Sequence, residues 1–206
     1  MRILVFGDSI AQGFWDVEGG WVSRLRRHFD SKGVADKTYD HPLIFNLGVS
    51  ADTTRDLLKR MESEIKARAR ENMIIVLSIG VNDSQVVGQS AFMTVDEYTV
   101  NIAKLLSIVK RFTNKILCVG LSPVVEQRTT PVSWIDISYT NERLKLFDVE
   151  LENVCIENAV EYIPIFNALY TAQQTSEHMT DGLHPDNNGH QVMLELILPE
   201  IEKLVS

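Results

Sequence analysis

Short apolar segments alternate along this chain with longer amphipathic ones, and this alternation constrains the fold more than any other feature. The apolar segments are rich in Ile, Val and Leu, as are strands covered on both faces. They are Ile3–Phe6, Leu43–Leu47, Met73–Ile79, Ile116–Leu121 and Tyr162–Ile165. The amphipathic segments have helical spacing. They are Trp21–Ser31, Thr53–Arg70, Asp96–Phe112, Asn141–Asn158 and Gly189–Leu204. The pattern predicts an α/β fold in which helices cover both faces of a parallel sheet.

The length of 206 residues fits a single domain spanning residues 1–206, and no internal repeat or linker divides it. Within the last helical segment, Pro199 is expected to kink or break the helix. The only long irregular segment, Ser122–Ser138, contains two prolines and Trp134. Long loops in compact domains are often functional, so this segment is a candidate wall of a binding site.

Composition narrows the possible partners. Twenty basic and 28 acidic residues give a net charge of -8, which disfavours nucleic acid and anionic membrane surfaces as partners. The apolar run Ile3–Phe6 is too short for a signal peptide, and no run approaches a membrane span. Cys118 and Cys155 lie in apolar contexts without CxxC spacing, which indicates reduced core residues. We therefore expect a cytoplasmic protein without stable membrane association.

Ligands of open α/β sheets bind beyond the carboxyl ends of the strands, so the residues that follow each strand are informative. The first strand leads into Gly7, Asp8 and Ser9, the second into "NLGVS", and the third into "GVND". Much later, "DGLHP" precedes the last helix. Taken singly, each of these residues is typical of a turn or a helix cap. Their order along the chain makes a shared site a stronger interpretation.

These residue types fit acyl transfer, which needs a nucleophile, a base, a group that orients the base and donors for the oxyanion. Ser9 is the candidate nucleophile and His184 the candidate base. Asp181, three residues before His184 and next to Gly182, is placed to hold the imidazole. The candidate oxyanion donors are the backbone amides of Ser9 and Gly48 and the side-chain amide of Asn82.

The blocks "FGDSIAQG", "NLGVSADT", "GVND" and "DGLHP", in this order, resemble the four sequence blocks of the GDSL/SGNH hydrolases. The resemblance implies a flavodoxin-like three-layer α/β/α sandwich with a five-stranded parallel sheet. It also implies the roles given above for Ser9, Asp181, His184, Gly48 and Asn82, and a reaction that needs no cofactor or metal. The chain departs from the family at Ile10 and Ala11, and again after Ser50, where a glycine is frequent.

Two other interpretations remain open from the residues alone. The first is a metal site formed by His178, Asp181, His184 and His190, whose spacing does not match a zinc template. The second is a non-catalytic flavodoxin-like module that uses "GDSIAQG" to bind a phosphate or a flavin. That module would leave "DGLHP" without a role, and the chain lacks the usual phosphate-loop patterns.

We therefore predict a serine esterase that cleaves esters or thioesters of small molecules through an acyl-enzyme. A carbohydrate O-deacetylase of the same family is the alternative. Four large side chains are candidates for the substrate pocket: Phe14, Trp15, Trp134 and Met179. Together they would crowd the mouth of the site, so we expect short acyl chains on soluble alcohols or thiols.

Overall fold

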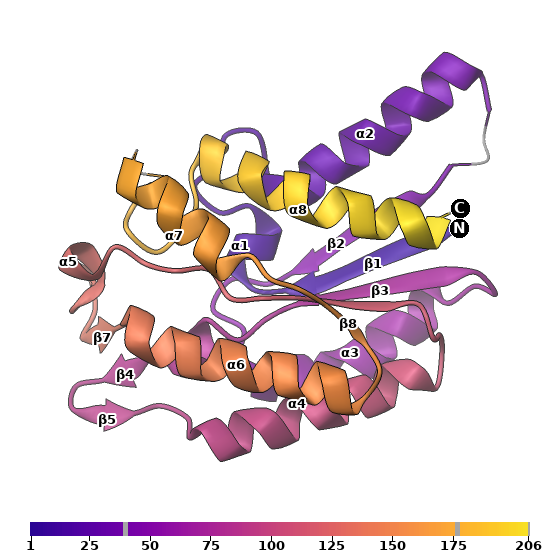
Figure 1. The fold of residues 1–206 in the computed structure, drawn as a ribbon. Coiled ribbons are helices and arrows are strands. Elements are labelled where there is room, and N and C mark those ends of the chain that lie inside the picture. Colours follow the sequence, from indigo (N-terminus) through magenta and orange to yellow (C-terminus); the bar gives the residue numbers. More distant parts are fainter. Residues whose placement is uncertain (39–40, 176–177, 206) are drawn as a thin grey trace.

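A five-stranded parallel sheet runs through the middle of the protein in the order β2-β1-β3-β6-β8 (Figure 1). The structure is a computed structural model that describes residues 1–38, 41–175 and 178–205. The strands are β1 (Arg2–Gly7), β2 (Leu43–Gly48), β3 (Met73–Ser78), β6 (Ile116–Val119) and β8 (Glu161–Ile163). They coincide with the five apolar segments of the sequence, and the predicted fold class is confirmed.

Helices cover both faces of this sheet, as Figure 1 shows. One layer contains α3 (Thr54–Arg68), α4 (Val95–Lys110) and α6 (Asn141–Glu157). The other contains α2 (Gly20–Asp36), α7 (Phe166–Thr175) and α8 (Asn187–Val205). Because both faces are covered, the central strands are apolar throughout, and every side chain of Ile3–Phe6 is fully buried. The core therefore lies on both sides of β1 and β3.

The central strands end level with one another. In the register of the sheet, Gly7 of β1 lies opposite Gly48 of β2 and opposite Ser78 of β3. The segments that follow these strands consequently meet at one edge, at the left of Figure 1, away from the chain termini. This edge is where the sequence predicts the site.

The segment Ser122–Ser138 is more ordered than the sequence indicates. It contains the short helix α5 (Glu126–Thr129) and the strand β7 (Ile137–Ser138). β7 pairs antiparallel with β4 (Val86–Val87), which also pairs with β5 (Ser90–Ala91). This small sheet was not predicted because two-residue strands are too short to produce a periodic pattern. It fastens the long segment to the loop that follows β3.

Three other details differ from the sequence prediction. α8 runs unbroken through Pro199, which is exposed, so the carbonyl that loses its helical partner faces solvent. The short helix α1 (Ser9–Gln12) and the helix α7 were not predicted.

Cys118 and Cys155 are buried free thiols, as expected. No helix in the described parts of the chain is long and apolar enough to cross a membrane.

Candidate active site

Ser9 is the first residue of α1, and only Asp8 separates it from the end of β1. Asp8 caps this helix, because its Oδ1 accepts a hydrogen bond of 2.9 Å from the Ile10 amide. Gly7 must be a glycine, since a Cβ there would lie 2.4 Å from the Ser78 carbonyl oxygen and 2.5 Å from the Ala11 Cβ. The close approach of β1 to its neighbours thus fixes the Ser9 hydroxyl at the edge of the sheet.

The loop before α8 brings His184 to Ser9. The Asp181 Oδ1 atom accepts hydrogen bonds from the amides of Leu183 at 2.9 Å and His184 at 2.8 Å. Gly182 allows this tight turn with a φ of 96°. The Asp181 Oδ2 atom lies 2.7 Å from His184 Nδ1, and His184 Nε2 lies 2.9 Å from Ser9 Oγ.

These contacts determine where the imidazole proton lies. An ionised carboxylate only accepts hydrogen bonds, so Nδ1 carries the proton that is donated to Asp181. The Nε2 lone pair then accepts the Ser9 hydroxyl. Burial would raise the pKa of Asp181, but hydrogen bonds from the His184 ring and from the two backbone amides outweigh it and lower that pKa to about 2. Asp181 is therefore ionised at neutral pH, and the arrangement can take a proton from the serine.

A second carboxyl group, that of Asp8, is buried beside this chain of contacts. Burial raises the pKa of Asp8 to about 7, against the opposing effects of the Ile10 amide and the charge of His184. The sequence indicated only a turn former at this position. Because the charge of His184 acts on Asp8, this carboxyl belongs to the electrostatics of the site.

Asn82 lines the same cavity as Ser9 and lies in the loop after β3, at the start of the short helix η1 (Asn82–Ser84). Its Nδ2 atom donates to the Asp52 carbonyl oxygen at 3.0 Å, and its Oδ1 atom accepts from the Tyr139 hydroxyl at 3.1 Å. The next residue, Asp83, is buried and accepts a 3.0 Å hydrogen bond from the Thr54 amide. These contacts fasten the loop to the start of α3.

Gly48, a candidate oxyanion donor, follows β2, and its amide donates to Asn46 Oδ1 at 3.0 Å within its own loop. The residue is also closely packed, because a Cβ there would lie 2.5 Å from the Gln12 amide nitrogen and 2.8 Å from the Asp8 carbonyl oxygen. Three residues later, Ala51 lines the cavity beside Ser9 and has a left-handed φ of 66°. Within the described parts of the chain, its amide has no acceptor.

A cavity of about 390 Å³ opens next to Ser9, and most of its wall is apolar. Its lining residues are Ser9, Phe14, Ser50, Ala51, Asn82, Gln85, Val132, Trp134, Ile135, Ile137, Tyr139, Leu183 and His184. Much of one wall comes from the segment Ser122–Ser138, as the sequence suggests. Among the residues that the structure describes, those lining the cavity include no Lys, Arg, Asp or Glu.

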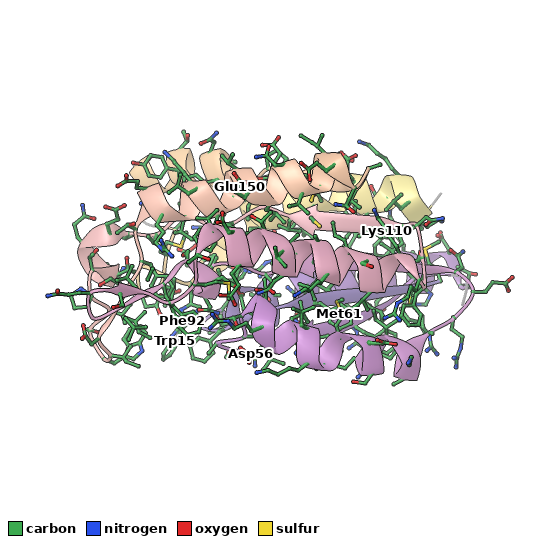
Figure 2. The ribbon with its side chains drawn as sticks, turned by 90° about the horizontal axis from the view of Figure 1, so that it is seen from below. Trp15, Asp56, Met61, Phe92, Lys110 and Glu150 are labelled. Carbon is green, nitrogen blue, oxygen red and sulfur yellow. The ribbon has the colours of Figure 1, made fainter. Side chains whose placement is uncertain are left out.

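The four predicted pocket residues divide into two pairs. Phe14 and Trp134 line the cavity, and the Phe14 ring lies 5.1 Å from the His184 ring. Trp15 and Met179 do not line it. Trp15 is exposed, packs edge-on against Phe14, and lies at the same end of the molecule as Phe92 (Figure 2). Met179 is buried and forms a bridge with Pro185, so it supports the loop that carries His184.

Several cavity residues were missed by sequence reasoning, notably Ala51, Gln85 and Tyr139. Ala51 had a signal, because it stands near the position where the family often has glycine, and a positive φ explains that preference. Gln85 and Tyr139 had none, because their places depend on the pairing of β4 with β7.

The histidines of the alternative metal interpretation do not gather into a ligand set. The described residues contain no group of three or more His, Cys, Asp or Glu side chains placed to hold a metal ion. His190 is fully buried under α2, where its Nδ1 accepts a hydrogen bond of 3.3 Å from the Trp21 amide.

Comparisons with known proteins show which proteins this chain resembles. The model of the GDSL-like lipase/acylhydrolase family matches residues 5–192. The isoamyl acetate-hydrolyzing esterase 1 homolog of Homo sapiens is 25% identical over 216 residues, which cover 100% of this chain and 83% of that protein. The Mus musculus homolog is 26% identical with the same coverage.

Solved structures share the fold. The lipase/acylhydrolase from Enterococcus faecalis superposes with a TM-score of 0.78 at 23% identity, covering 98% of this chain and 95% of that one. An acetylxylan esterase from Geobacillus stearothermophilus gives a TM-score of 0.73 at 20% identity, covering 97% and 93%.

Proposed function

Because the chain belongs to the GDSL-like lipase/acylhydrolase family, we propose that Ser9, His184 and Asp181 form the catalytic triad of this esterase. The observation that carries the proposal is the continuous chain of contacts from Asp181 Oδ2 to His184 Nδ1, at 2.7 Å, and from His184 Nε2 to Ser9 Oγ, at 2.9 Å. This series of contacts ends at Ser9, which lines an apolar cavity in which an ester can reach the serine.

In the proposed reaction, the Ser9 oxygen attacks the ester carbonyl carbon while His184 Nε2 takes the hydroxyl proton. The imidazolium then gives this proton to the leaving alcohol as the bond from carbon to the alkoxy oxygen breaks, which leaves an acyl-enzyme. A water molecule, activated by the same nitrogen, attacks the acyl-enzyme and releases the acid. Asp181 remains ionised throughout, in keeping with its pKa of about 2, and stabilises the imidazolium.

The oxyanion of the tetrahedral intermediate needs hydrogen-bond donors. We assign this role to the backbone amides of Ser9 and Ala51 and to the side chain of Asn82. One Asn82 N–H is engaged by the Asp52 carbonyl, and within the described parts of the chain the other has no acceptor. Ala51 replaces Gly48 in this assignment, since the Gly48 amide is engaged by Asn46 while the Ala51 residue lines the cavity.

The substrates proposed are neutral esters with short acyl groups, from acetyl to hexanoyl. The described lining residues include no Lys or Arg, so they offer no cationic partner to a phosphate or a carboxylate on the substrate, which argues against phospholipids and anionic thioesters. The similarity to isoamyl acetate-hydrolyzing esterase homologs supports acetate esters of small alcohols. The exposed Trp134 beside the cavity also suits stacking on a sugar ring, so acetylated sugars are the second candidate class.

A panel of esters tests this proposal. The panel varies the acyl chain from acetyl to hexadecanoyl on one alcohol, and includes isoamyl acetate, acetylated xylose and an acetyl thioester. We expect the highest kcat/KM on the short neutral esters, without a rise in rate when the substrate forms micelles. A preference for dodecanoyl to hexadecanoyl esters, with a jump in rate on micelle formation, would contradict the proposed substrate class.

A further inference from the structure

Tyr139 and the candidate oxyanion donor Asn82 line the same cavity and contact each other there. Its buried hydroxyl lies 3.1 Å from Asn82 Oδ1. On the basis of the proposed function, we propose that Tyr139 is a positioning residue. Through this hydrogen bond it holds the Asn82 side-chain amide in the rotamer that aims its second N–H at the developing oxyanion.

The contacts of Asn82 determine the orientation of its amide group. The Asp52 carbonyl oxygen only accepts hydrogen bonds, so the Asn82 atom that lies 3.0 Å from it is the nitrogen. The opposite atom is then the oxygen, and the Tyr139 hydroxyl donates to it. With two of its bonding positions fixed by protein groups, the amide plane cannot rotate, and its remaining N–H has one direction.

Tyr139 is itself held rigidly. Its backbone amide donates to the Thr129 carbonyl oxygen at 2.9 Å, and the buried Thr129 hydroxyl donates to the Tyr139 carbonyl oxygen at 3.0 Å. β7, which ends at Ser138, is paired with β4. The hydroxyl is therefore positioned by the ordered segment Ser122–Ser138 and not by the strand that precedes Asn82.

The chemistry of the hydroxyl suits a permanent donor. Burial, together with the charges of Asp8 and Asp181, raises the pKa of Tyr139 well above its usual value of 10. The phenol is thus protonated at neutral pH. Its proton goes to Asn82 rather than to Gln85, whose Oε1 is more distant at 3.5 Å. Donation to Oδ1 also polarises the amide and strengthens the bond that Nδ2 can donate.

Among the described residues, the Tyr139 hydroxyl is the donor to the Asn82 oxygen, so its removal gives the amide freedom to turn. The donor is needed most when the carbonyl oxygen becomes an anion, so the loss should appear in kcat and not in KM. A residue that only supports the pocket wall would change KM or stability instead.

Tyr139→Phe tests this role with short-acyl esters. We expect kcat to fall by about 10-fold with KM nearly unchanged. In an Asn82→Ala background, the same substitution should cause no further loss, because the tyrosine acts only through that amide. Tyr98→Phe is the matched control. It removes another buried hydroxyl, which bonds the Ile79 carbonyl at 3.4 Å, just before the same loop, without touching Asn82.

A wild-type kcat for Tyr139→Phe would overturn the proposal, as would an equal loss in the Asn82→Ala background or an equal loss in Tyr98→Phe. If Tyr139→Phe does not fold, Tyr139→Met, which fills the space with a flexible side chain lacking a hydroxyl donor, replaces it in the cycle. These results are separate from failure of the proposed function, which would show as full activity of Ser9→Ala.

Discussion

The Nε2 atom of His184 lies 2.9 Å from the Oγ atom of Ser9, although 175 positions separate the two residues in the sequence. The contact is possible because β1 delivers Ser9 to the carboxyl edge of the sheet and the turn at Asp181 returns the chain to that edge before α8. Both side chains are buried to more than nine-tenths, with exposures of 7% and 6%, yet both line the cavity. Their contact is therefore shielded from water on all sides except the one on which a substrate would bind.

The Asn82→Ala variant should lower kcat by about 10²- to 10³-fold with a smaller effect on KM. The reason is that the lost N–H is needed most in the transition state. Steady-state kinetics on a short-acyl ester measure this, with Asn158→Ala as the control, since Asn158 lies at the far end of α6. An Asn82→Ala enzyme with wild-type kcat would reduce Asn82 to a turn residue.

Replacing Asp181 by Asn should lower kcat by about 10³- to 10⁴-fold without unfolding the protein. The Asn Oδ1 can still accept from the two backbone amides, but its NH2 group would face Nδ1 and force the proton onto Nε2. That tautomer cannot accept the Ser9 proton. Since the pKa of Asp181 is about 2, this carboxyl should not produce the acid limb of kcat/KM in the wild type near neutral pH. Retention of full activity by Asp181→Asn would remove Asp181 from the triad.

Trp134→Ala should widen the range of accepted acyl chains. The indole lines the cavity and is 60% exposed, so its removal opens the mouth at small cost in stability. We expect the ratio of kcat/KM for octanoyl against acetyl esters to rise by about 10-fold. Trp15→Ala is the matched control, because Trp15 is equally exposed but does not line the cavity. Equal changes in both variants would argue that Trp134 does not limit chain length.

Asp8 should make the protein less stable as the pH rises towards neutrality. Below its unfolded pKa of 3.8 the carboxyl is protonated in both states. Between that value and the folded pKa of about 7, the native state keeps a proton that the unfolded state has lost, so the free energy of unfolding falls as pH rises. Above pH 7 the full penalty is present.

Asp8→Asn removes this charge and keeps a side-chain oxygen for the Ile10 amide. Thermal melts at pH 5 and pH 8 should therefore show a gain for the variant that is larger at pH 8, by about 3 kcal/mol. The exposed Asp136→Asn serves as the control. A gain that does not depend on pH would show that the native carboxyl titrates normally.

The sequence predicted the central sheet because continuous Ile, Val and Leu runs have few other stable environments in a chain of this length. It also predicted that Ser9 and His184 would meet, because Ser9 follows the end of a strand and the order of the sequence blocks resembles that of the GDSL/SGNH hydrolases. The hydrogen bond from Tyr139 to Asn82 could not be predicted, because it depends on the two-residue strands β4 and β7. The engagement of the Gly48 amide likewise depends on the rotamer of one side chain, Asn46, which no sequence pattern reveals.

Covalent labelling of Ser9 tests the central claim most directly. A fluorophosphonate reacts with a serine only where a base removes its proton and donors stabilise the phosphoryl oxygen. Intact mass measurement followed by peptide mapping should find a single adduct on Ser9, formed in step with the loss of esterase activity. The Ser9→Ala protein should melt like the wild type and remain unlabelled. Labelling of Ser9→Ala to the same extent, or an active wild type that carries no adduct on Ser9, would contradict the assignment of Ser9 as the nucleophile.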